Sequence, residues 1–231
     1  MRKISLHLRT IAACGAALSL SLTAAPALAV DVDTQQWSLF TFQKDLSRRW
    51  IAYFELQPRF GNDVSGVERL IVRPALGYRI TPKFSVWQGY GWTPLFMPGF
   101  RDEHRLYQQF LYEETLGVTA VSNRTRFEQR FIEGTGSTSH RFRTMFRVQH
   151  PVSRDRRWAV VAYDELFWNL NSVPNGPAAG FDQNRVFLGV SRVLNPQLRV
   201  ETGYLLNQIN APSGSPNRQL NVWVTMFSWR L

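Results

Sequence analysis

Segments of about ten residues in which polar and apolar side chains alternate recur along this chain, separated by stretches rich in Gly, Pro, Asn and Ser. In residues 50–60 every even-numbered side chain is apolar, and most odd-numbered ones are polar. Because successive side chains of a β-strand point to opposite faces, this period predicts strands with one apolar and one polar face. Outside the first 29 residues, no apolar run is longer than about six residues, whereas a membrane-spanning helix needs ~20 apolar residues.

The residue types on the two faces narrow the choice of β fold. The polar face is mainly arginine with glutamate, and the apolar face draws on 8 Trp, 7 Tyr and 16 Phe. The solvent-facing sheet of a soluble β-sandwich would favour Lys, Ser, Thr and Glu, whereas the planar guanidinium of arginine suits paired, partly buried sites. Aromatic girdles are typical of membrane barrels. We therefore predict an all-β fold, an antiparallel transmembrane β-barrel with Arg and Glu inside.

The strand number follows less directly from the pattern. Single-chain bacterial barrels normally have an even number of strands, so we expect 10–12 strands and favour twelve. The connections alternate between short and long, and we place the long ones outside the cell. Eleven segments can be drawn, at about 35–44, 49–60, 67–80, 83–94, 103–116, 122–132, 139–150, 157–169, 181–194, 197–209 and 217–231.

The N-terminus has the ordered parts of a secretory signal. Residues 1–9 carry three basic residues and no acid, residues 10–25 are mostly apolar, and small residues stand at Ala27 and Ala29. This order predicts a signal peptide that is cleaved after Ala29. The apolar stretch is too short and too interrupted for a comfortable membrane anchor.

The sequence thus divides into a signal peptide, 1–29, and a barrel domain, 30–231. Cys14 leaves with the signal, and it lies too early in the apolar stretch for a lipoprotein box. The remaining 202 residues have no cysteine and a net charge of +7, so stability cannot come from disulfides. We expect the outer membrane of a Gram-negative bacterium as the location.

The last segment supports the same location. Trp223, Phe227 and Trp229 share one face, and the sequence ends at Leu231. This is similar to the terminal strand that the barrel assembly machinery reads in outer-membrane proteins. The expected partners are that machinery, outer-membrane lipid and lipopolysaccharide. An exported chain is not expected to bind nucleic acid despite its basic charge, and the oligomeric state stays open.

Several polar strand motifs run through nearly all of the predicted barrel domain. They are RLYQQ at 105–109, RFEQRF at 126–131, DELF at 164–167, FDQNR at 181–185 and ETGY at 201–204. Together they resemble an uncharacterised family of small outer-membrane β-barrel proteins, the domain of unknown function 2490 (DUF2490). The resemblance implies a barrel and carries no catalytic residues.

Catalytic and metal sites find little support in the sequence. His104, His140 and His150 are the histidines beyond the signal, and three scattered histidines make a poor metal site. Ser139 and His140 are adjacent, so in a strand they would point to opposite sides and could not act as nucleophile and base. We expect no enzyme, cofactor or metal. An outer-membrane lipid-modifying enzyme is the third alternative for the function.

Charges that point into a narrow barrel need partners, because isolated buried charge is costly. We predict that the inward Arg and Glu form a network. We expect the network to fill the lumen, so that the barrel is structural and its loops carry any recognition. The alternative, which a surplus of inward arginine would favour, is a narrow anion-preferring channel for small solutes. The predicted members are Glu55, Arg59, Arg69, Arg73, Arg105, Glu113, Arg126, Glu128, Arg130, Arg141, Arg143, Arg147, Glu165, Arg185, Arg199 and Glu201.

Overall fold

The computed structural model describes residues 30–211 and 215–231, so the predicted signal peptide and its cleavage site at Ala27 and Ala29 lie outside the described residues. Within the described ranges the chain forms strands and no helix, and therefore no helix that could cross a membrane. The strands are β1 (Asp31–Asp45), β2 (Trp50–Gly61), β3 (Gly66–Arg79), β4 (Phe84–Trp92), β5 (Glu103–Leu116), β6 (Thr119–Ile132), β7 (Ser139–Pro151), β8 (Trp158–Asn169), β9 (Gly180–Asn195), β10 (Leu198–Ile209) and β11 (Arg218–Arg230).

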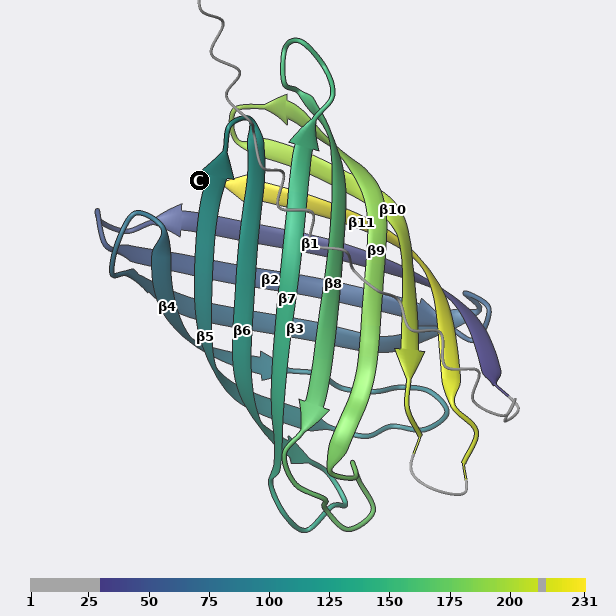
Figure 1. The fold of residues 1–231 in the computed structure, drawn as a ribbon. Helices are drawn as coiled ribbons and strands as arrows, with labels where there is room; N and C mark the ends of the chain where they lie inside the picture. The colour runs from purple at the N-terminus through teal and green to yellow at the C-terminus, as the bar shows by residue number, and fades with distance from the viewer. Residues whose placement is uncertain (1–29, 212–214) are drawn as a thin grey trace, which may run out of the picture.

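The eleven strands form one closed barrel in which each strand pairs with its neighbours in sequence (Figure 1). Each predicted segment corresponds to one strand, and the first segment is part of the wall as β1. The preference for twelve strands was wrong. It followed the even strand number that is normal for such barrels, in which the first and last strands meet antiparallel. Here residues 31–43 of β1 pair in parallel with residues 218–230 of β11, and this parallel pair closes an odd-numbered barrel.

The connections differ between the two ends of the barrel. The connections 62–65, 93–102, 133–138 and 170–179 lie at one end, together with residues 210–211, residues 215–217 and the start of β1. The turns 46–49, 80–83, 117–118, 152–157 and 196–197 lie at the other. Because the strand number is odd, Asp31 and Leu231 lie at opposite ends. We refer to these ends as the long-connection end and the short-turn end.

The two faces of the wall have opposite character, as the period-two pattern predicts. Inward side chains are buried and often charged. Glu128, for example, is only 2% exposed. Outward side chains are apolar and open, and Leu188 in the middle of β9 is 62% exposed. This is the reverse of the distribution in a water-soluble domain, where apolar side chains are buried.

Inward aromatic rings lie against glycines of the neighbouring strand. The Tyr107 ring covers Gly89 so closely that a Cβ on that glycine would lie 2.1 Å from the ring, and Trp87 covers Gly77 in the same way at 2.5 Å. Glycine at these two positions therefore lets a large ring lie flat on the wall. Flat packing of this kind leaves the middle of the barrel available for other side chains.

Candidate functional site

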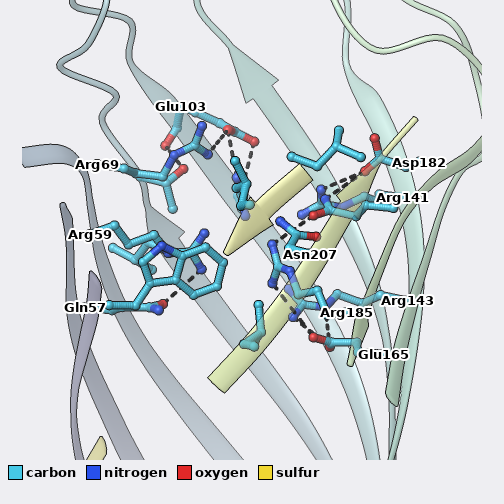
Figure 2. A pocket seen from close by; sticks show the side chains of 18 of the residues that line it. Gln57, Arg59, Arg69, Glu103, Arg141, Arg143, Glu165, Asp182, Arg185 and Asn207 are labelled. Carbon is cyan, nitrogen blue, oxygen red and sulfur yellow. Dashed lines mark hydrogen bonds and ion pairs between the residues drawn. The ribbon is translucent and has the colours of Figure 1, made fainter. Parts of the chain in front are cut away.

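A cavity of about 720 Å³ occupies the lumen and is the candidate functional site (Figure 2). Strands on all sides contribute to its walls, and residues of the long connections, such as Arg101, Asn175 and Ala211, line it as well. The cavity therefore reaches the long-connection end of the barrel. Its depth extends to Tyr163 and Met226.

Arginine dominates the lining. Among the residues that the structure describes, twelve arginines and five carboxylates line the cavity. Glu128 and Glu201 pair with lining arginines without lining the cavity themselves, and arginine stays in excess when both are added. The carboxylates of the lining are Glu55, Glu68, Glu103, Glu165 and Asp182.

Glu128 on β6 is the most deeply buried hub of the charge network. Arg141 donates from Nε and Nη2 to Glu128 Oε2 at 3.0 and 2.7 Å, and Arg143 donates from Nη1 to Glu128 Oε1 at 3.2 Å. Arg126 Nη1 lies 3.7 Å from the same carboxylate. Arg141 faces Glu128 directly across the β6–β7 ladder. Strand register thus brings one carboxylate under three guanidinium groups.

Glu103 forms a second hub near the long-connection end. Arg105, two residues along β5 and therefore on the same face, donates to both carboxylate oxygens at 2.7 and 2.8 Å. Arg130 donates to Glu103 Oε1 at 2.6 Å from β6, and Arg69 Nη1 lies 3.8 Å from Oε2. The Arg69 contact is long for a charge-assisted hydrogen bond.

Glu165 on β8 is the third hub. Arg124 and Arg143 both donate to Glu165 Oε1 at 2.7 Å, and Arg185 Nη1 lies 3.9 Å from Oε2. Glu165 pairs directly with Arg185 across the β8–β9 ladder, which accounts for the Arg185 contact. Arg143 also donates from Nε to Oε1 at 2.9 Å, so this one oxygen accepts three hydrogen bonds, while Arg185 has only a distant contact.

Two simpler pairs also belong to the network. Arg73 donates to Glu55 at 2.7 Å, opposite it across β2 and β3. Arg147 contacts both oxygens of Glu201 at 2.9 and 2.5 Å, which joins β7 to β10 across the lumen.

Guanidinium groups also stack on inward aromatic rings. The Arg126 guanidinium lies 4.1 Å from the Tyr107 ring centre, and Arg143 and Arg185 each lie 4.4 Å from Phe167. Such cation–π contacts contribute about 1–2 kcal/mol where water is excluded. The rings therefore stabilise positive charge that the carboxylates do not fully balance.

A family model described as a protein of unknown function (DUF2490) matches residues 34–219. The chain belongs to this family. An uncharacterised protein of Methylorubrum extorquens is 36% identical over 201 residues, which cover 82% of this chain and 85% of that protein. The resemblance inferred from the strand motifs is confirmed.

The structure of this DUF2490 chain places most of the predicted network residues together in the lumen, with two exceptions. Glu113 is exposed near the short-turn end and forms no ion pair with another described residue. Arg199 is also exposed, and its contact is with Gln149 at 3.4 Å. Both residues lie near strand ends. The alternation still places them on the inward face there, but their side chains lie outside the crowded middle of the barrel.

Two network members were not in the predicted set. Arg124 shares the inward face of β6 with Arg126, so the period-two rule could have identified it. Asp182 contacts Arg141 at 3.2 Å although its neighbour Gln183 is the more deeply buried residue. The register shift in the β8–β9 ladder falls at Asp182, which lies between the paired residues Phe181 and Gln183. A bulge of this kind re-aims side chains in a way that alternation cannot predict.

The histidines do not gather around a nucleophile. His104 contacts Tyr90 Oη with Nδ1 at 2.5 Å and Asp102 with Nε2 at 3.2 Å. Ser139 is buried and His140 is exposed, on opposite sides of the wall. Within 30–211 and 215–231, no three His, Cys, Asp or Glu residues are arranged to hold a metal.

Proposed function

We propose that this protein is an outer-membrane β-barrel whose lumen is a narrow, anion-preferring channel for small solutes. The exposed apolar outer wall supports a lipid environment, since it would otherwise present a continuous apolar surface to water. The predicted signal peptide supports export. In this proposal, outer-membrane lipid and lipopolysaccharide surround the barrel, and the assembly machinery inserts it through β11.

The surplus of arginine along the cavity carries the proposal. Rings of arginine lower the energy of an anion in a pore and raise that of a cation. With twelve arginines against five carboxylates on the lining, the interior has a positive potential that persists after the ion pairs are formed. The cavity volume leaves room for a hydrated small ion beside these side chains.

A structural barrel is the second candidate, and the three carboxylate hubs favour it. Glu103, Glu128 and Glu165 each hold several guanidinium groups, and a network that fills the lumen would stiffen the wall and block passage. In that case the long connections would carry recognition. The two candidates differ in whether solute crosses the barrel, so conductance separates them.

Membrane location comes first in the test. The protein expressed from its full sequence is fractionated, and its gel migration is compared with and without heating. We expect it in the outer-membrane fraction with a heat-dependent shift. Recovery from the soluble periplasm without such a shift would reject the barrel in the membrane.

Conduction is then measured with the refolded protein in a planar bilayer under a KCl gradient. We expect discrete current steps and a reversal potential shifted towards the equilibrium potential of chloride. Arg73→Gln and Arg105→Gln should each reduce chloride preference, whereas Arg154→Gln, in an exposed short turn, should not. A silent barrel at every voltage would reject the channel and leave the structural candidate.

A further inference from the structure

The cavity has a second wall that the charge network does not explain. Strands β10, β11 and β1 are neighbours in the sheet, and their inward residues in the cavity are mainly apolar. Leu205, Leu220 and Val224 belong to one buried apolar cluster with Trp37, and Leu39 packs against it. Met226 continues this surface deeper into the lumen. A path for bare inorganic ions has no need of an apolar strip along its length.

Two arginines meet this strip with unbalanced charge. Arg59 has no carboxylate within 4 Å in the described part of the chain; its Nη2 donates to Gln57 at 3.2 Å, and its buried Nε finds no partner there. Arg185 donates to Gln183 at 3.0 Å, reaches Glu165 only at 3.9 Å, and also has a buried Nε without a partner in residues 30–211 and 215–231.

The Trp37 ring joins these two arginines. The Arg59 guanidinium lies 3.6 Å from the ring centre and the Arg185 guanidinium 5.1 Å from it. Trp37 is itself only 3% exposed, and its Nε1 donates to Gln35 at 2.7 Å, which fixes the ring. Two like charges are thus held against one ring, and both arginines line the cavity, from opposite sides in Figure 2.

We propose that Arg59, Arg185 and Trp37 form a binding site for a small organic anion that carries a carboxylate on an apolar body. Two guanidinium groups would take the carboxylate through charge-assisted hydrogen bonds, and Leu205, Val224 and Met226 would cover the apolar part. A purely inorganic anion would use the arginines and leave the apolar strip without a role. This inference rests on the proposed function, because it assigns the solute class of the same lumen.

The test is equilibrium binding of 4-phenylbutyrate to the refolded barrel, measured by calorimetry. Butyrate supplies the carboxylate without the apolar body, and 4-phenylbutylamine supplies the body with the opposite charge. We expect saturable binding of 4-phenylbutyrate and affinities at least about tenfold weaker for both comparison compounds, since each lost charge-assisted or apolar contact corresponds to about 1.4 kcal/mol or more.

Variants test whether the two arginines and the apolar strip both contribute to binding. Arg59→Gln and Arg185→Gln should each weaken 4-phenylbutyrate about tenfold, and Arg59→Lys should restore part of the loss because it keeps the charge. Met226→Gln, close in size, should weaken 4-phenylbutyrate and leave butyrate unchanged. Arg154→Gln serves as the control for loss of one positive charge. Heat-dependent gel migration verifies that each variant is folded.

Each outcome decides separately on the site and on the channel. A folded barrel that binds 4-phenylbutyrate but conducts no current supports the site and rejects the channel. A conducting barrel that binds butyrate as well as 4-phenylbutyrate, or that binds neither, rejects the site and leaves the channel standing. If the wild type, Arg59→Gln and Arg185→Gln all bind 4-phenylbutyrate equally well, the assignment of the site to these two arginines is also rejected.

Discussion

Replacing Glu128 by glutamine tests whether the ion pairs of this buried hub exclude water. The side chain of Glu128 is almost fully buried, and Arg141 and Arg143 make three hydrogen bonds to it. Glutamine keeps the shape but removes the negative charge. It also turns an N–H group towards guanidinium donors, so at least one short contact becomes repulsive.

The expected loss of stability follows from this environment. Breaking a buried ion pair by neutralising one partner costs about 3–5 kcal/mol, because the other charge stays buried without compensation. Arg126 at 3.7 Å also loses its neighbouring carboxylate. We therefore expect Glu128→Gln to lower the free energy of unfolding by about 3 kcal/mol or more, as measured by urea unfolding of the barrel in lipid vesicles.

Glu114→Gln is the matched control, since Glu114 forms its ion pair with Lys83 in solvent at the short-turn end. It should leave the unfolding midpoint unchanged. If Glu128→Gln also left it unchanged, water would be replacing the lost partner, and the account of Glu128 as a water-excluded hub beside the cavity would be refuted. Chloride preference should not fall in Glu128→Gln, because the substitution removes negative charge.

Three further predictions address the wall, the membrane and the orientation. Gly89→Ala should destabilise the barrel by about 1–3 kcal/mol through overpacking against Tyr107. Gly91→Ala should not, because the added Cβ would lie 3.7 Å from its nearest neighbour; urea unfolding of the two variants tests this. Leu188→Arg, in the middle of β9, should cost about 2–4 kcal/mol in lipid vesicles, and Leu170→Arg in a long connection should cost far less; equal effects would argue against a lipid-facing wall. Cysteines introduced at Gly99 and Arg154 lie at opposite ends, so an impermeant maleimide should label only the Gly99 position in intact cells; labelling of Arg154→Cys alone would reverse the orientation.

Much of the wall could be predicted from the sequence, because alternation is a local property. A strand's side chains change sides at every residue, so Arg105, Glu128 and Arg141 could be placed inside before any contact was known. The same rule placed Trp50 and Trp223 outside. Family membership followed from strand motifs for the same reason, since each motif lies within one strand.

The closure of the barrel could not be predicted in this way. Whether β1 meets β11 in parallel or antiparallel depends on the total strand number and on pairing between the two ends of the chain. No short segment contains that information, and the general preference for even numbers pointed to twelve. The position of Asp182 likewise depended on a local register shift rather than on its place in the alternating pattern.

The composition and period of the sequence thus determined an apolar outer wall and a charged interior. Only the tertiary structure decided which charges are balanced. Glu103, Glu128 and Glu165 draw in the arginines that register and curvature bring near them, while Arg59 and Arg185 meet at Trp37 beside an apolar strip. Contacts across a lumen depend on how far the strands are staggered when the barrel closes, and this stagger is a property of the whole sheet.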